Sequence, residues 1–217
     1  MDPTAVGVIG SGNVGRALAR GFASRGHDVM IGSRSPDKPD LRESLDGDGE
    51  TVRAGTFDAV ARHGQIAVLA TPGAAVDEAI ARAGPENLAS KVLIDVTNPL
   101  EFSDDGPPTL SRGHTDSGGE HVQRLAPDAR VVKAFNIVNY NYMVDPDLPG
   151  GPPDMFIAGN DDAAKATVTE VLESFGWPAM DIGGIEGARQ LESLCLLWVA
   201  IGMRRGAFDH AFKLLTG

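Results

Sequence analysis

The chain of 217 residues is long enough for one large domain, or for a domain with a small additional lobe. Its 19 Lys and Arg residues are outnumbered by 30 Asp and Glu residues, which gives a formal net charge of −11. So acidic a surface repels phosphate backbones and anionic membranes, and we therefore expect neither nucleic acid nor a membrane as a partner.

The cysteine and histidine residues indicate the cellular compartment of the protein and whether it binds a metal. The single cysteine, Cys195, lies in an apolar run and has no partner for an intrachain disulfide, which is typical of a core thiol in the reducing cytoplasm. That run is about half of the ~20 residues that a membrane span needs, and the chain begins without a signal-peptide pattern. The five histidines show no spacing typical of a metal site. We expect a cytoplasmic protein without a bound metal.

Short apolar runs alternate with amphipathic patterns along the first two thirds of the chain. Val14, Leu18 and Phe22 recur at the spacing of one helix face, whereas residues 66–70 form a continuous apolar run typical of a buried strand. The alternation predicts an α/β fold with a doubly wound, mainly parallel sheet of the Rossmann type. Predicted strands are residues 5–10, 28–32, 51–54, 66–70, 91–95 and 131–134, and predicted helices are 14–24, 57–62 and 74–82.

The remaining segments predict a long loop and a small C-terminal α/β lobe. Residues 103–119 are rich in Gly and Pro, and we expect a loop that is either a functional lid or a disordered insertion. Ser117 and Glu120 then form a capping-box pattern before a helix over residues 121–125. We predict a Rossmann domain over residues 1–145 and a lobe over 146–217. Its elements are strands 155–158 and 178–182, a helix ending at 175, and an apolar helix over 188–204 that is buried either in the lobe or in a dimer.

The first turn of the predicted sheet carries the sequence Gly10-Ser11-Gly12-Asn13-Val14-Gly15. This Gly-x-Gly-x-x-Gly pattern follows a strand directly and opens an amphipathic helix, which is the context that a dinucleotide-binding turn requires. The first glycine permits the tight turn, the second lets a pyrophosphate approach the backbone, and the third lets the helix pack closely. The free N–H groups at the helix N-terminus then face the phosphates.

The end of the second strand distinguishes NADP from NAD. In an NAD site an acidic residue stands there and binds the ribose 2′-OH. Here the strand ends in Ser33-Arg34, with Lys38 four residues further. A hydroxyl and a guanidinium suit a 2′-phosphate, which a carboxylate would repel. The sequence therefore predicts NADP(H) as the cofactor.

Three later loops follow predicted strands and are expected to lie along the cofactor, because ligands bind outside the carboxyl ends of parallel strands. They contain Thr71-Pro72, Asn98-Pro99 and the segment 133–136. Asn136 could donate a hydrogen bond to an acceptor ring or to the nicotinamide carboxamide. Lys133 could be a proton donor, but a structural ion pair is the preferred interpretation.

The sequence resembles the coenzyme F-420-dependent NADP oxidoreductases and the related N-terminal domain of the STEAP metalloreductases. The resemblance covers nearly the whole chain and is carried by residues 10–15, 31–34, 66–72, 131–136, 158–162 and 191–194. It implies a cleft between a Rossmann domain and a small lobe, with NADP in the cleft and a flavin-like ring against the nicotinamide. It also implies a homodimer, since the family often dimerises.

Carried over residue by residue, the resemblance assigns groups of residues to parts of the cofactor. Ser11, Gly12, Asn13 and Val14 would hold the pyrophosphate, Ser33, Arg34 and Lys38 the 2′-phosphate, and Pro72, Gly73, Asn98 and Ala134 the nicotinamide or its partner. The implied activity is hydride transfer between NADPH and a small-molecule redox acceptor, either the deazaflavin F-420 or FMN or FAD. Two alternatives stay open, namely an NADP-dependent dehydrogenase of a small organic substrate and a non-catalytic NADP-binding sensor.

Overall fold

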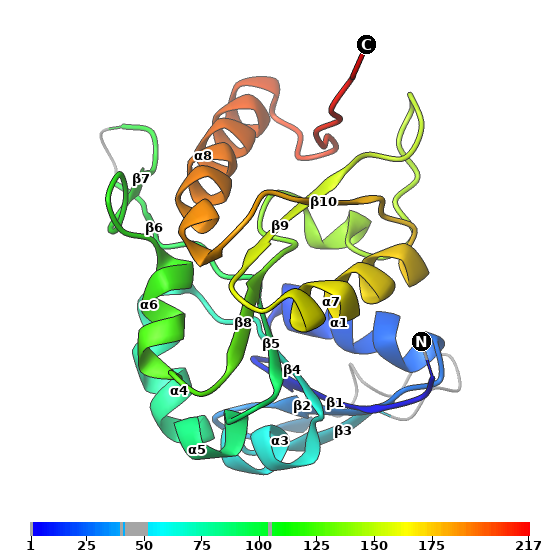
Figure 1. Cartoon of the computed structure of the whole chain (residues 1–217), viewed down its shortest axis with the longest axis vertical. Coiled ribbons are helices and arrows are strands. Elements are labelled where there is room, and N and C mark those ends of the chain that lie inside the picture. Colours follow the sequence, from blue (N-terminus) through cyan, green and yellow to red (C-terminus); the bar gives the residue numbers. More distant parts are fainter. Residues whose placement is uncertain (1, 40, 42–51, 104–105) are drawn as a thin grey trace.

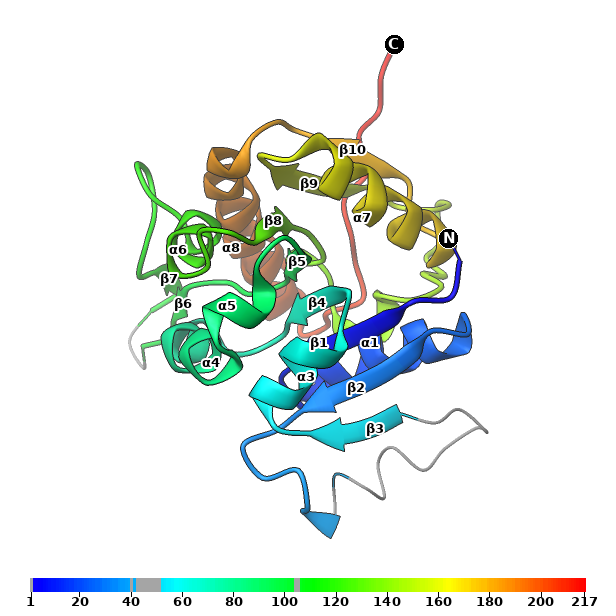
Figure 2. The ribbon, with the colours of Figure 1, turned by 60° about the horizontal axis from the view of Figure 1, so that its bottom comes forward.

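A computed structural model describes residues 2–39, 41, 52–103 and 106–217. Its central feature is an eight-stranded sheet in the order β10-β9-β8-β5-β4-β1-β2-β3, which Figure 2 shows running through the molecule with helices on both sides. The strands are β1 (Ala5–Ile9), β2 (Asp28–Gly32), β3 (Val52–Gly55), β4 (Ile66–Leu69), β5 (Val92–Asp95), β8 (Arg130–Lys133), β9 (Met155–Gly159) and β10 (Ala179–Asp181).

Strand β1 lies at the point where the winding of the chain changes direction. It pairs in parallel with β2 on one side and with β4 on the other, because the chain first proceeds to β2 and β3 and then returns to continue as β4, β5 and β8. The fold is thus the predicted Rossmann-type, doubly wound, mainly parallel sheet. Such a fold leaves a crevice at the carboxyl ends of β1 and β4, where ligands bind.

Helices cover both faces of this sheet because each presents one apolar side to it (Figure 1). Side chains from α1, α7 and α8 form one core with the sheet, and side chains from α3, α4 and α6 form the other. The helices are α1 (Asn13–Ser24), α3 (Phe57–His63), α4 (Val76–Ala83), α5 (Pro85–Leu88), α6 (Gly118–Leu125), α7 (Asp162–Ser174) and α8 (Ala188–Arg205), and the 3₁₀ turns are η1 (Gly73–Ala75), η2 (Tyr140–Tyr142) and η3 (Ile185–Gly187).

The C-terminal block extends the same sheet. Strand β9 pairs antiparallel to β8, with Val132 opposite Gly159, and β10 pairs in parallel with β9. Across the two blocks, the rings of Phe22 and Phe175 meet edge to face with centroids 5.0 Å apart. The division into domains at residues 145 and 146 stays a prediction.

The segment predicted as a long loop contains regular structure. Strand β7 (Thr109–Leu110) lies within it and pairs antiparallel with β6 (Leu100–Glu101), which precedes it, and residues 104–105 lie outside the described residues. The helix expected at residue 121 begins earlier, at Gly118, because the Ser117 hydroxyl caps it by accepting a hydrogen bond of 3.1 Å from the Glu120 N–H.

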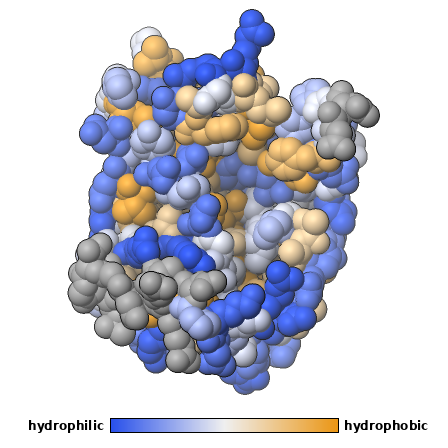
Figure 3. Space-filling model, turned by 180° about the vertical axis from the view of Figure 1, so that it is seen from behind, coloured by the Kyte–Doolittle hydropathy of each residue, from blue (hydrophilic) through white to orange (hydrophobic). Residues whose placement is uncertain are grey.

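Helix α8 is buried along one face only within the single chain, so the choice between burial in the lobe and burial in a dimer stays open for its other face. Leu191, Cys195 and Trp198 face the interior, whereas Leu197 and Met203 are 51% and 56% exposed. Figure 3 shows apolar residues in the upper part of the rear face and a hollow near its middle. None of the helices in the described ranges is long and apolar enough to cross a membrane.

Candidate cofactor-binding site

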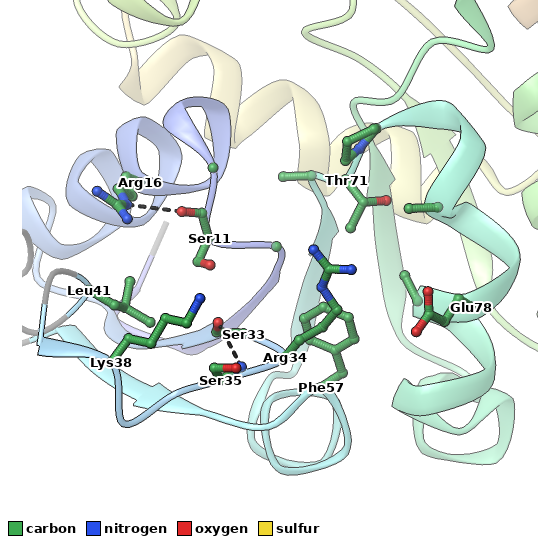
Figure 4. Close-up of a pocket in the computed structure, with 16 residues that line it drawn as sticks. Ser11, Arg16, Ser33, Arg34, Ser35, Lys38, Leu41, Phe57, Thr71 and Glu78 are labelled. Atoms are coloured by element: carbon green, nitrogen blue, oxygen red, sulfur yellow. Dashed lines mark hydrogen bonds between the residues drawn. The ribbon is translucent and has the colours of Figure 1, made fainter.

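A pocket of about 570 Å³ opens at the carboxyl ends of β1 and β4, next to the end of β2 (Figure 4). It therefore occupies the crevice that the strand order predicts. The structure brings together around it eight of the residues singled out from the sequence, which are Gly10, Ser11, Gly12, Ser33, Arg34, Lys38, Thr71 and Pro72.

The three glycines of the first turn differ in what surrounds them. Gly10 has a φ of +122°, and a Cβ there would lie 2.3 Å from the Ala70 carbonyl oxygen, so the turn requires glycine. A Cβ on Gly15 would lie 2.0 Å from the carbonyl oxygen of Gly10, so the first helical turn packs directly on the strand end. A Cβ on Gly12 would meet no atom within 4 Å. The space beside Gly12 is therefore open to a ligand.

The N-terminus of α1 borders this open space. The helix begins at Asn13, its N-cap Gly12 has no side chain to accept a hydrogen bond, and the first turn contains no acidic residue. The N–H groups of Asn13, Val14 and Gly15 thus lack partners within the helix, and their dipoles favour an anion.

The end of β2 brings positive charge to the pocket. Figure 4 shows the Lys38 ammonium extending toward Ser33 and Ser11, and the Arg34 guanidinium extending toward Thr71. Within the described ranges neither cation forms an ion pair, and Ser33 is fixed by a hydrogen bond of 3.1 Å from the Ser35 N–H to its hydroxyl oxygen. The two side chains are thus available to an anionic group, although the whole chain is acidic.

Two other charged side chains line the pocket. Arg16 donates from Nε to the Ser11 carbonyl oxygen at 2.9 Å, which fixes its position beside the glycine turn. Glu78, the acidic residue on the opposite wall, is paired with Arg82 at 2.7 Å. This pairing offsets the one carboxylate that would otherwise oppose an anion in the pocket.

Gly73, Asn98, Ala134 and Asn136 form a second group of predicted residues at the carboxyl ends of β4, β5 and β8. Gly73 lies so close to the next loop that a Cβ would be 2.2 Å from the Asn98 carbonyl oxygen. The Asn98 amide Nδ2 donates to the Asn136 carbonyl oxygen at 2.8 Å, and the Asn136 amide Nδ2 donates to Asn98 Oδ1 at 2.9 Å. Ala134 is fully buried beside them.

The hydrogen bonds of Asn136 correct the donor role expected for it. Its second amide hydrogen goes to the Leu191 carbonyl oxygen at 3.0 Å, and a carbonyl can only accept, which fixes the orientation of the amide. Both hydrogens are therefore in use. Asn136 is 4% exposed, and its Oδ1 is buried without a partner in the described part of the chain. The free group is an acceptor.

Lys133 forms the ion pair that was preferred over a catalytic role. Its ammonium lies 2.7 Å from Asp95 Oδ2 and 2.8 Å from Glu192 Oε1, and all three side chains are buried. Burial alone would lower the pKa of Lys133, but the two carboxylates more than offset it and raise that pKa above its usual value. A lysine held so firmly in its charged form is a poor proton donor.

Sequence reasoning missed several residues of these two groups. Arg16 and Ser35 stand next to the predicted motifs, but nothing in the pattern says that they face the pocket. Phe57 lines it from a helix that is distant in sequence. Asp95 and Glu192 could have been found as charged residues within apolar segments, because a buried charge requires a partner.

Comparisons with known proteins show which family the sequence matches. The sequence model of the family described as NADP oxidoreductase, coenzyme F420-dependent, matches residues 5–99. The F420-dependent NADP reductase of Methanothermobacter marburgensis is 30% identical over 208 residues, covering 90% of each chain. The metalloreductase STEAP3 of Rattus norvegicus is 29% identical over 88% of this chain, which spans only 36% of that protein.

Solved structures extend the likeness to three dimensions. A crystal structure from Arthrobacter sp. FB24, provisionally assigned as an F420-dependent NADP reductase, has a TM-score of 0.92 and 40% identity, covering 98% of this chain and all of that one. A reductive aminase from Aspergillus terreus in complex with NADPH has a TM-score of 0.66 at 21% identity, covering 94% of this chain and 64% of that one. The second likeness shows the fold alone.

Proposed function

The chain belongs to the family of coenzyme F420-dependent NADP oxidoreductases, and from this premise we propose that it transfers a hydride between NADPH and a flavin-like acceptor, either F420 or FMN or FAD. The observation that carries the proposal is the pocket at the ends of β1, β2 and β4, which combines an open glycine turn with two unpaired cations among the described residues. NADP dependence follows from the family, whereas the acceptor is the proposed part.

The residues of the pocket fit NADP(H) at both of its phosphate groups. The space beside Gly12 admits a pyrophosphate next to the free N–H groups of α1. Arg34 and Lys38, with the hydroxyls of Ser33 and Ser35, suit a 2′-phosphate, which accepts several charge-assisted hydrogen bonds. The hydroxyl of Thr71 is buried without a partner among the described residues, so a ligand in the pocket could satisfy it.

From the pyrophosphate, the rest of the dinucleotide would extend along the strand ends toward Asn98 and Asn136. These follow β5 and β8, which are the next strands beyond β4 in the sheet. There the unpartnered Asn136 Oδ1 could accept a hydrogen bond from the nicotinamide carboxamide. Satisfying a buried acceptor in this way favours one orientation of the ring.

The chemistry requires little from the protein beyond this binding. When bound, NADPH supplies the hydride and the acceptor ring takes it up. The side chains of this chain bind and orient the two partners at near-attack distance and exclude water. Lys133 is held in its ion pairs and is not free to donate a proton, which agrees with this chemistry, because hydride transfer between two such rings needs no acid from the protein.

Consumption of NADPH with a series of acceptors tests the proposal. We expect loss of NADPH absorbance when F420, FMN or FAD is added, and none with small carbonyl or imine compounds. Consumption with a carbonyl or imine compound alone would replace this proposal by the small-substrate dehydrogenase. NADPH binding without turnover on any acceptor would favour the sensor.

The Arg34→Ala substitution tests the 2′-phosphate site separately. We expect NADPH to bind roughly 10- to 100-fold more weakly, because a charge-assisted hydrogen bond to a phosphate is lost. NADH binding should stay nearly unchanged, since NADH has no 2′-phosphate. Arg62→Ala removes an exposed arginine that is paired with Asp58 outside the pocket, and it is the matched control in titrations with both nucleotides. Equal losses for NADPH and NADH in Arg34→Ala contradict the assignment.

We also propose a homodimer, supported by the large apolar side chains that α8 leaves exposed, Leu197 and Met203. Light scattering of the purified protein should give twice the mass of one chain. A Leu197→Glu variant should shift that mass toward the monomer, because a charge at a buried interface is unfavourable.

A further inference from the structure

We propose that Glu192 is a positioning residue, which acts through Lys133 to hold the Asn98–Asn136 pair in place for the nicotinamide end of the cofactor. The inference rests on the proposed function, because it requires NADP(H) to reach these two asparagines. It assigns a role to a buried group of charges that hydride transfer itself does not use.

Three charged side chains, those of Lys133, Asp95 and Glu192, are buried at the junction of β5, β8 and α8, with exposures of 0%, 0% and 1%. Removing such charges from water is costly, and well-packed apolar side chains of similar volume often give equal or greater stability. Stability alone therefore gives no reason for this arrangement. Its geometry indicates positioning, because each group is held by several directional contacts.

Glu192 connects three elements. Its Oε2 accepts a hydrogen bond from the Gly118 N–H at 2.8 Å, and its Oε1 accepts one from the Gly119 N–H at 3.0 Å, both at the start of α6. The same Oε1 lies 2.8 Å from the Lys133 ammonium at the end of β8. A Cβ on Gly118 would lie 3.0 Å from Glu192 Oε1, so the glycine permits this approach.

Lys133 connects Glu192 to the loop after β5. Its ammonium donates to the Thr97 carbonyl oxygen at 2.8 Å, in addition to its two carboxylate contacts. Asp95 Oδ1 accepts from the Thr97 N–H at 2.9 Å and from its hydroxyl at 2.7 Å. Thr97 is thus held by its carbonyl, N–H and hydroxyl groups, directly before Asn98.

The asparagine pair connects the loop after β5 back to α8. Asn98 and Asn136 exchange two hydrogen bonds, and Asn136 also donates to the carbonyl oxygen of Leu191, the neighbour of Glu192. The connection therefore forms a closed ring through Glu192, Lys133, Thr97, Asn98, Asn136 and Leu191. Among the described residues, the buried amide atom that this ring leaves without a partner is Asn136 Oδ1, the acceptor proposed for the nicotinamide.

The backbone between β8 and Asn136 shows why such a restraint is needed. Phe135 has a φ of +59°, which is unusual for a bulky residue and costs energy. The acceptor that its N–H meets among the described residues is the weak one of Met155 Sδ, at 3.2 Å. A strained turn persists only where its surroundings fix it, and the contacts of Lys133 and Asn136 on either side do so.

The test is the Glu192→Gln variant with two ligands that differ only at the nicotinamide. NADPH carries the ring, and 2′-phospho-ADP-ribose shares every other part of it. Glutamine keeps the size of the side chain, but its NH₂ group would face either the Gly118 N–H or both the Gly119 N–H and the Lys133 ammonium, so at least one contact is lost. We expect the dissociation constant for NADPH to rise at least 10-fold and that for 2′-phospho-ADP-ribose to change less than 2-fold.

Glu120→Gln is the matched control. Glu120 also connects α6 and α8, through Arg189, with contacts of 2.8 and 2.5 Å, but in the described part of the chain it forms no hydrogen bond with a side chain of the ring. Both dissociation constants should stay within 2-fold of those of the unchanged protein. This control distinguishes the effect of losing any contact between α6 and α8 from the effect of losing the contacts of Glu192.

The Thr97→Val variant tests the same inference if Glu192→Gln does not fold. It removes only the hydroxyl contact with Asp95 and changes no charge, and we expect about a 3-fold loss for NADPH with no change for 2′-phospho-ADP-ribose. Equal losses for both ligands, or no loss for NADPH in a folded variant, would overturn the inference. If the unchanged protein binds neither ligand, the proposed function fails first, and the inference fails with it.

Discussion

At the scale of single residues, the three glycines of the first turn have different surroundings. Gly10 and Gly15 are required by the fold, because any Cβ there meets a backbone oxygen. Gly12 is not required by the fold, because the space beside it is open. Its lack of a side chain benefits only a ligand, so stability and binding can be separated by mutation.

We predict that Gly12→Ala folds with an unchanged unfolding midpoint but loses NADPH binding by at least 10-fold, because its Cβ would occupy the space of the pyrophosphate. Gly15→Ala should instead destabilise the fold by about 1–3 kcal/mol, since its Cβ would lie 2.0 Å from the Gly10 carbonyl oxygen. Thermal unfolding and NADPH titration of both variants check this. A Gly12→Ala protein that binds NADPH normally contradicts the placement of the pyrophosphate.

Sequence reasoning found the residues that follow strands, since the winding of the chain alone brings those positions to one edge of the sheet. It could not say which atoms are free there. The donor expected at Asn136 is engaged by Asn98 and by Leu191, and Leu191 belongs to a helix far along the chain. No pattern within residues 131–136 contains that information.

At the scale of elements, the predictions depended on length and periodicity. Long amphipathic or apolar runs such as α1 and β4 were located to within one or two residues. The single-turn helix α5 and the two-residue strands β6 and β7 were not predicted, because so few residues show no period. Composition could not show which face of α8 is buried in the chain, where Glu192 lies on the buried face while Leu197 is exposed.

Helix α6 offers a pH-dependent test of one element. The Arg189 guanidinium beside Glu120 lowers the pKa of that carboxyl group below its usual value of 4.5. A lowered folded-state pKa contributes stability above pH 4.5, and this contribution is lost as the pH falls through the folded-state pKa. We predict that Glu120→Gln unfolds at lower urea than the unchanged protein at pH 7, and that the difference shrinks as the pH falls below about 4.5. A difference that is constant with pH would show that the ion pair contributes nothing.

At the scale of the whole molecule, the sheet joins segments that the sequence suggested as separate blocks. The composition shift near residues 146–153 is real, but the strand after it pairs with β8. The core on one face draws on both blocks, including Phe22 of α1 and Phe175 and Trp177 beyond α7. A shift in composition shows where the residue types along a chain change. Pairing between strands that are distant in sequence determines which segments unfold together.

This shared core predicts one cooperative unfolding transition. Both tryptophans, Trp177 and Trp198, lie after residue 146 and are 1% and 9% exposed, so their fluorescence reports on the C-terminal block. Far-ultraviolet circular dichroism reports on all helices and strands. Urea titrations followed by the two signals should coincide in midpoint and slope, because exposing Trp177 also removes the contact between Phe22 and Phe175 that joins the blocks. If the fluorescence transition came first, with the dichroism retaining a second step, residues 1–145 would fold independently and the two-domain division would hold.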